Sequence, residues 1–145
     1  MFAILTPTAV RDQYLRTGDG FVCAYAITMM ATFKETNVLH DRILMLKDVP
    51  RVPFILVGNK MDLEEDREVP YEKGKELATQ LGVPFLETSA KKRTNVTETF
   101  EAVVREIDRM RAEKDAKDSG KPVSEGTSTP RPPPKRKNVI KCIVL

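Results

Sequence analysis

The sequence predicts an α/β domain built on a parallel sheet, and two observations support that prediction. Three short segments are almost continuously apolar, the pattern of parallel strands that are covered on both faces. The segments that follow them carry apolar residues at helical spacing. The expected strands are residues 21–27, 54–58 and 83–90. Strand and helix therefore alternate along the chain, as in a doubly wound α/β layer.

Three helices are expected after these strands. The first covers residues 32–47 and ends before Pro50. The second lies between Pro70, which suits a first helical turn, and Gly82, which suits a C-terminal cap. The third covers residues 95–113, and its apolar residues recur at steps of three and four along one stripe: Val96, Phe100, Val103, Ile107 and Met110.

Length and composition favour one soluble globular domain. The chain has 145 residues, of which 41% are hydrophobic and 31% charged. No apolar run approaches the roughly 18 residues of a membrane span. The first ten residues lack basic side chains and contain Pro7, so a signal peptide is not expected. Cys23 and Cys142 do not form a disulfide framework, which favours a reducing, intracellular setting.

Charge and composition separate a tail from the rest of the chain. Residues 114–145 hold eight basic and three acidic residues, and most of this stretch is rich in Ser, Gly, Thr and Pro. Residues 115–141 bury too little apolar surface to offset chain entropy, so we expect a disordered basic tether. The run has no interleaved aromatic residues, which argues against nucleic acid as a partner. The expected divisions are 1–9, 10–113 and 114–145.

A polar motif follows the second expected strand. Asn59, Lys60 and Asp62 come directly after the apolar residues 54–58. A carboxylate accepts two parallel hydrogen bonds, and guanine offers that pair of donors at N1 and its exocyclic N2. Adenine has no N2 amine and presents an acceptor at N1, so Asp62 would reject it. The Lys60 stem can lie along the base while its ammonium stays in water.

A second motif ends the third expected strand, with Ser89, Ala90 and Lys91. The carboxyl ends of parallel strands meet at one edge of a sheet, where such folds bind ligands. A backbone N–H near Ala90 could reach the guanine O6. Each motif alone also fits an ordinary polar turn or a helix cap. Together, at the ends of two buried strands, they favour guanine recognition.

At this point the chain resembles the Ras subfamily of small GTPases. The resemblance rests on "ILVGNKMDL", "ETSAK", "RDQYLRTGDGFVCAYAI" and the terminal "KCIVL", and it runs from about Val10 to Arg111. It implies a G domain that binds GTP or GDP as a membrane-associated signalling switch. The guanine-binding residues it implies are Asn59, Lys60 and Asp62, with Ser89 supporting the loop and Ala90 and Lys91 completing the base pocket.

The chain departs from the family pattern in its phosphate-binding half. Residues 1–145 contain no Gly-x-x-x-x-Gly-Lys-Ser/Thr string, and the first switch and the Asp-x-x-Gly element are also absent. Residues 1–9 match nothing in the family, and the chain is expected to begin within the second switch, of which Arg11, Asp12 and Tyr14 resemble a remnant. We expect no catalytic residue, missing Mg²⁺ ligands and weak nucleotide binding, and whether the chain is an enzyme stays open.

Two function classes follow. The first is a Ras-type switch whose phosphate site is not within these residues, and the alternative is a non-catalytic, membrane-tethered interaction module or truncated isoform. Effectors and exchange factors cannot be assigned without the switch regions. With its earlier neighbours missing, the strand over 21–27 is expected to be an unpaired apolar edge that favours association. Cys23 is expected in the core, and His40 at the surface or boundary rather than on a metal.

The last four residues, Cys142 to Leu145, match the C-a-a-X prenylation signal. A terminal Leu favours geranylgeranyl over farnesyl at Cys142, which makes a prenyltransferase a partner. One lipid binds membranes only marginally, so a second signal is needed. Basic residues beside an anionic inner leaflet can supply it: Lys135, Arg136, Lys137 and Lys141. The expected location is the cytoplasmic face of the plasma membrane.

Overall fold

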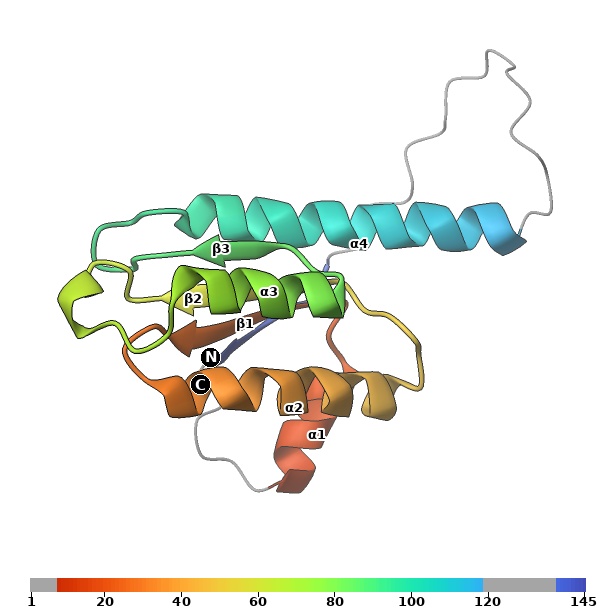
Figure 1. Cartoon of the computed structure of the whole chain (residues 1–145). Coiled ribbons are helices and arrows are strands. Elements are labelled where there is room, and N and C mark those ends of the chain that lie inside the picture. Colours follow the sequence, from red (N-terminus) through yellow and green to blue (C-terminus); the bar gives the residue numbers. More distant parts are fainter. Residues whose placement is uncertain (1–7, 119–137) are drawn as a thin grey trace, which may run out of the picture.

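The structure, a computed structural model, describes residues 8–118 and 138–145. A four-stranded parallel sheet lies at its centre (Figure 1). The strands are β1 (Gly20–Ala26), β2 (Phe54–Asn59), β3 (Phe85–Glu87) and β4 (Ile140–Val144), and they lie in the order β3-β2-β1-β4. All three pairings are parallel. The α/β class with a parallel sheet, as expected of a partial Ras-like G domain, is confirmed.

Helices cover both faces of the sheet (Figure 1). They are α1 (Thr8–Arg16), α2 (Met30–Lys47), α3 (Tyr71–Leu81) and α4 (Val96–Asp118), with a 3-10 turn, η1 (Glu64–Asp66), before α3. Successive residues of a strand point to opposite faces. In β1, Phe21, Cys23 and Tyr25 accordingly join the core beneath α1, α2 and α3. Val22 and Ala24 join a second cluster beneath α4.

The ends of the predicted helices are set by residues that tolerate left-handed backbone. Asp48 follows α2 with φ 50°, and Gly82 follows α3 with φ 67°. In both cases the N–H of the capping residue bonds to carbonyls of the last helical turn, which satisfies groups that the helix leaves open. Pro70 precedes α3 directly, as predicted.

The structure differs from the prediction in two helices. We did not predict α1, although it places the buried Leu15 against the sheet. α4 continues to Asp118, five residues past the predicted end, because the apolar stripe marks only the part that contacts the sheet. Val103 and Ile107 of that stripe are buried, whereas Phe100 is 42% exposed near the start of the helix.

The prediction of an unpaired edge at β1 was wrong. β4 pairs along β1 from Gly20 opposite Ile140 to Ala24 opposite Val144. Its apolar, β-branched residues suit a strand that faces helices on both sides. Ile143 is 3% exposed in the core beneath α1 and α2, while Ile140 and Cys142 lie on the face beneath α4.

The predicted disordered tail also needs correction at its two ends. Residues 114–118 belong to α4, and residues 140–144 form β4. The middle of that tail and the segment 1–7 lie outside the described residues, and the domain division stays a prediction. Of the helices in residues 8–118, none is long and apolar enough to cross a membrane.

The side chains of Cys23 and His40 are both buried. Cys23 is 0% exposed in the core, as predicted, and burial raises the pKa of its thiol to about 12. His40 is also buried, not at the surface, with its ring edge-on to Phe54 at 4.9 Å between ring centres. Among the described residues, no group of three His, Cys, Asp or Glu side chains could hold a metal ion.

Candidate guanine site

The two predicted motifs lie side by side where β2 and β3 end. The Thr88 N–H bonds to the Gly58 carbonyl at 2.8 Å, and the Met61 N–H bonds to the Thr88 carbonyl at 3.0 Å. These backbone bonds continue the strand pairing into the loops that carry the motifs. The structure therefore brings Asp62 and Ser89 together, although 27 residues separate them in the chain.

Asp62 is held in place by Ser89. The buried Ser89 hydroxyl donates a hydrogen bond to Oδ1 of Asp62 at 2.7 Å and accepts one from the Lys92 N–H at 3.1 Å. The Ser89 bond, with help from Lys91 and Lys92, lowers the pKa of the Asp62 carboxyl below its ordinary value. Oδ2 of Asp62 has no side-chain partner in the described part of the chain. Asp62 is thus an oriented, ionised carboxylate that can accept further donors.

Asn59 connects the two loops. Its Oδ1 accepts the Lys60 N–H at 2.8 Å and lies 3.4 Å from the Thr88 hydroxyl, which donates to it. Its carbonyl accepts the Ile27 N–H from the end of β1 at 3.1 Å. The side-chain oxygen of Asn59 is therefore already used to hold the loops, and a contact of Asn59 with a base stays a prediction.

Lys60 adopts a backbone conformation that its residue type rarely takes. Its φ is 68°, and Arg93 and Asn95 in the neighbouring loop have φ 54° and 57°. Three non-glycine residues in the left-handed region mark these loops as constrained, a feature that clusters at binding sites. The Lys60 side chain is exposed, which leaves its stem available to a flat ligand.

Ala90 and Lys91 complete the exposed side of the second loop. Within residues 8–118 and 138–145, no hydrogen bond is recorded for the Ala90 N–H. That amide is therefore available to a carbonyl oxygen, and its contact with a base stays a prediction. The structure places Asn59 at the end of β2 and the other five predicted residues in the two adjoining loops.

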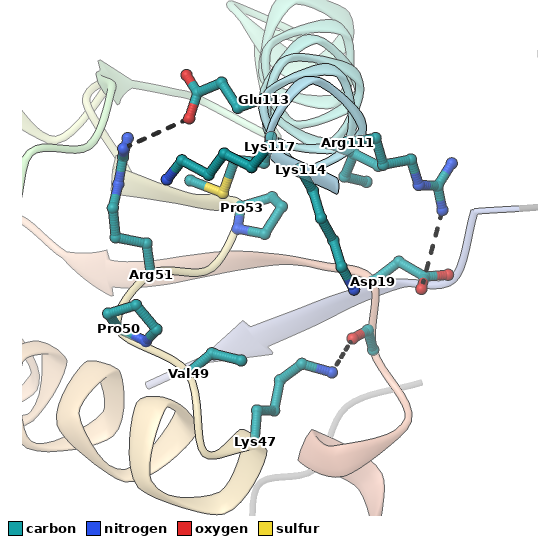
Figure 2. Close-up of a pocket in the computed structure, with 13 residues that line it drawn as sticks. Asp19, Lys47, Val49, Pro50, Arg51, Pro53, Arg111, Glu113, Lys114 and Lys117 are labelled. Carbon is teal, nitrogen blue, oxygen red and sulfur yellow. Dashed lines mark hydrogen bonds and ion pairs between the residues drawn. The ribbon is translucent and has the colours of Figure 1, made fainter. Parts of the chain in front are cut away.

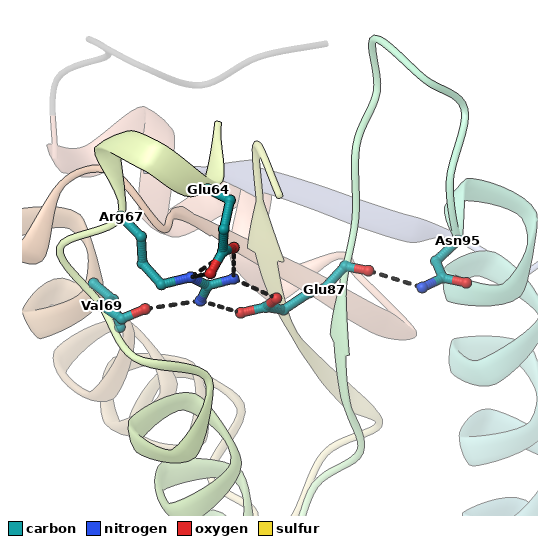
Figure 3. A network of polar contacts seen from close by, with 5 residues as sticks. All are labelled: Glu64, Arg67, Val69, Glu87 and Asn95. Carbon is teal, nitrogen blue, oxygen red and sulfur yellow. Dashed lines mark hydrogen bonds and ion pairs between the residues drawn. The ribbon is translucent and has the colours of Figure 1, made fainter. Parts of the chain in front are cut away.

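A buried ion pair that the sequence did not reveal lies behind the loops (Figure 3). Arg67 donates to both carboxylate oxygens of Glu87, at 2.6 and 2.8 Å. The two side chains are only 15% and 9% exposed. Arg67 also bonds to the Glu64 carboxylate and, at 2.9 Å, to the Val69 carbonyl.

The ion pair of Arg67 and Glu87 connects the two loops. Arg67 follows η1 in the loop of the first motif, and Glu87 is the last residue of β3, directly before the second. The Asn95 amide donates to the Glu87 carbonyl at 2.9 Å, which ties the far end of the second loop to the same residue. Glu87 raises the pKa of Arg67 more than any other neighbour. No local pattern marks this pair, because its partners are 20 residues apart.

The residues present fit a guanine base but not its phosphates. Asp62 offers a carboxylate oxygen, Ala90 an amide and Lys60 an exposed stem around one edge of the sheet. In the 145-residue sequence, no glycine-rich Gly-Lys-Ser/Thr loop is present to cradle phosphates.

A cavity of about 460 Å³ lies at the opposite ends of the strands (Figure 2). It is lined by Gly18 and Asp19 before β1, Pro53 before β2, and the last turns of α4. Ion pairs cross its rim, with Arg51 3.7 Å from Glu113 and Arg111 3.9 Å from Asp19. Its lining does not include residues of the two motifs, which lie at the loops after β2 and β3 that we call the guanine loops.

The predicted membrane signals are only partly visible. Cys142 is half-buried within β4, and Lys141 beside it places its Nζ 4.1 Å from the centre of the Tyr14 ring. Lys135, Arg136 and Lys137 lie outside the described residues. The predicted switch remnant is in α1, where Asp12 accepts two hydrogen bonds from Arg42 of α2 at 2.8 and 2.7 Å.

The chain is also similar in sequence to known proteins. The model of the Ras family matches residues 7–109. The Ras-like protein rasS of Dictyostelium discoideum is 56% identical over 104 residues, which cover 72% of this chain and 54% of that protein. The Ras-like protein rasB of the same organism is 57% identical over 100 residues, or 69% and 51% of the two chains. The chain thus spans about half the length of the curated relatives it matches.

Proposed function

The chain belongs to the Ras family, and we propose on that premise that it carries the guanine-recognition half of a small GTPase site on a lipid-anchored domain. The observation that carries the first part is the bond from Ser89 to Asp62, which aims a carboxylate at the edge where β2 and β3 end. Asp62 would accept the N1 and N2 hydrogens of guanine, and the Ala90 amide would donate to its O6. GTP and GDP are the ligands in question.

The strength of binding follows from what contacts the ligand. A charge-assisted hydrogen bond contributes about 1.5–3 kcal/mol, while association costs roughly 4–15 kcal/mol. Base contacts without phosphate contacts therefore leave affinity at about millimolar or weaker. Hydrolysis depends on positioning and charge around the γ-phosphate, so these 145 residues are not expected to catalyse it. The absence of those groups favours a non-catalytic membrane-tethered module as the second candidate.

The nucleotide proposal is tested by replacing the Asp62 carboxylate, which only accepts hydrogen bonds, with an amide, which also donates them. Asp62→Asn places an amide opposite the base, which disfavours guanine and favours xanthine, whose 2-oxo group accepts the amide N–H. The measurement is NMR titration of the chain with guanosine and xanthosine monophosphates. The matched control is Asp66→Asn in the same loop, whose side chain is exposed. An unchanged preference in Asp62→Asn would refute the assignment of Asp62.

For the membrane, we propose that Cys142 is geranylgeranylated. Sulfur of Cys142 would attack the first carbon of an isoprenoid diphosphate, the carbon–oxygen bond would break, diphosphate would leave, and the thiol proton would pass to solvent. The support is the terminal Cys-Ile-Val-Leu signal with basic residues before it. Each Lys or Arg near an anionic cytoplasmic leaflet adds about 1 kcal/mol. The resulting location is the cytoplasmic face of the plasma membrane.

A localisation assay tests the anchor. The whole chain, fused at its N-terminus to a fluorescent protein, is compared in cells with Cys142→Ser. We expect membrane fluorescence only with the native cysteine. The matched control is Cys23→Ser, which removes the other thiol and leaves the C-terminal signal intact. Equal distribution of the native and Cys142→Ser fusions would contradict the anchor.

A further inference from the structure

The C-terminal strand places the proposed lipidation signal inside the sheet. β4 contains Cys142, and its pairing with β1 runs through Val22 opposite Cys142. The Leu145 N–H donates to the Ala24 carbonyl at 2.8 Å, so pairing extends to the last residue. All four residues of the C-a-a-X signal are therefore engaged with β1.

Side chains reinforce this pairing on both faces. Ile143 is 3% exposed and packs in the core with Leu15 of α1 and Leu39 of α2. Cys142 points to the other face, where it contacts the cluster that includes Ile107 of α4. Cys142 is half-buried there, so an isoprenoid chain on its sulfur would have to displace the side chains that contact it on this face of the sheet.

The residues before Cys142 are also held. The Val139 N–H donates to Oδ2 of Asp19 at 2.8 Å, and the Asp19 N–H donates back to the Val139 carbonyl at 2.7 Å. Arg111 donates to the side chain of Asn138 at 2.8 Å. Lys141, one of the basic residues assigned to the membrane, lies over the Tyr14 ring. When β4 pairs with β1, both Cys142, the proposed lipid acceptor, and Lys141, one of the basic residues proposed to bind the membrane, are therefore held against the protein.

We propose that the outer edge of β1 is an acceptor site for the chain's own C-terminal strand, and that β4 masks Cys142 from lipid transfer until the strand leaves the sheet. A transferase that reads four terminal residues must hold them itself, which paired residues do not permit. Once lipidated, Cys142 cannot return, so the modified tail stays undocked. Burial also raises the pKa of the Cys142 thiol, which lowers the fraction of reactive thiolate. The proposal rests on the proposed function of Cys142.

Alkylation kinetics test the mask in the 145-residue chain. The Leu145 N–H points to β1, and the two-residue period of a strand turns the Lys141 N–H the same way. Lys141→Pro removes that donor, whereas the control Lys141→Ala keeps it and loses the same charge. We expect maleimide to modify Cys142 at least about tenfold faster in Lys141→Pro than in Lys141→Ala, which corresponds to about 1.4 kcal/mol of strand docking.

Cys23 reports whether the rest of the sheet survives. It lies in β1 at 0% exposure, and it must stay unmodified while Cys142 reacts. Equal Cys142 rates in the native chain and both variants would overturn the proposal. Exposure of Cys23 together with Cys142 would overturn it as well, because β4 would then not leave the sheet independently.

A transfer assay separates this proposal from the lipid anchor itself. Purified prenyltransferase and geranylgeranyl diphosphate are added to the native chain, to Tyr14→Ala/Asp19→Ala, which leaves the tail sequence unchanged, and to the surface control Gln13→Ala. Faster lipidation of the double variant alone supports the mask. If Cys142 of the double variant alkylates readily but accepts no lipid, the anchor is wrong and the mask stands. Equal lipidation of all three chains contradicts the mask and leaves the anchor intact.

Discussion

The guanine loops and the C-terminal strand are held to the same sheet by different forces. The loops after β2 and β3 are fixed by side chains, chiefly the buried pair of Arg67 and Glu87 and the bond from Ser89 to Asp62. β4 is held mainly by backbone hydrogen bonds along β1 and by the buried side chain of Ile143, and further side-chain contacts come from Asp19, Arg111 and Tyr14. Side-chain networks hold one geometry, whereas a paired sheet edge can be vacated. The difference separates the proposed guanine site, whose geometry side chains fix, from the strand that we propose leaves the sheet.

The largest effect is expected from loss of the ion pair that holds the guanine loops. Arg67→Ala leaves the Glu87 carboxylate buried without its bidentate partner, and we expect a loss of about 3–5 kcal/mol in the free energy of unfolding. Urea denaturation measures it. The control Arg105→Ala removes an exposed pair with Glu101 and is expected to cost less than about 1 kcal/mol. Similar losses in both variants would contradict the importance of the buried pair.

The next effect concerns β4. Ile143→Ala removes the buried anchor of the strand, and a buried Ile→Ala change costs about 2–5 kcal/mol when the site stays folded. Under the proposal that β4 leaves the sheet alone, we expect a loss near the lower figure, together with rapid hydrogen exchange at the outer edge of β1. Val139→Ala, where the side chain is 41% exposed, is the control. Slow exchange at that edge in Ile143→Ala would argue against a releasable strand.

A smaller effect is expected on the pKa of Asp62 in the guanine loops. The Ser89 hydroxyl is the main cause of the lowered pKa of Asp62, so Ser89→Ala should raise that pKa toward its ordinary value. Because the folded-state pKa is depressed, this interaction stabilises the fold above the unfolded pKa and is lost as pH falls through the folded pKa. NMR titration of the Asp62 carboxyl measures the shift. Ser89→Thr keeps the hydroxyl, and an equal shift in both variants would exclude the hydrogen bond as its cause.

The smallest effect is expected at His40 of α2, outside the two regions. Burial lowers its pKa, partly opposed by Asp41, so the folded chain favours neutral imidazole. Its contribution to stability is therefore full above the unfolded pKa of about 6.5 and decreases as pH falls below it. We expect the native chain to lose more stability between about pH 7.5 and 5 than His40→Gln. Equal losses, measured by urea midpoints, would show that His40 does not contribute.

The sequence predicted the parts that depend on local patterns. Three strands, α2 and α3 follow from apolar runs, Pro70 and Gly82, and the adjacency of Asp62 and Ser89 follows from the rule that parallel strands end at one edge. Arg67 and Glu87 could not be paired in advance, since charged residues 20 positions apart meet only once the loop after η1 and the end of β3 are placed in the fold. β4 was missed because Cys-Ile-Val-Leu satisfies both a lipidation signal and a buried strand.

The most direct measurement compares nucleotides that differ only in the part these residues can recognise. The chain is titrated with GMP, AMP and Mg²⁺-GTP, and amide shifts of Asp62, Ala90 and Lys91 are followed by NMR. We predict affinity of about millimolar or weaker for GMP, weaker binding of AMP, and binding of GTP no more than a few-fold tighter than that of GMP. Sub-micromolar binding of GTP, or equal binding of GMP and AMP, would contradict a site that recognises guanine but not phosphate.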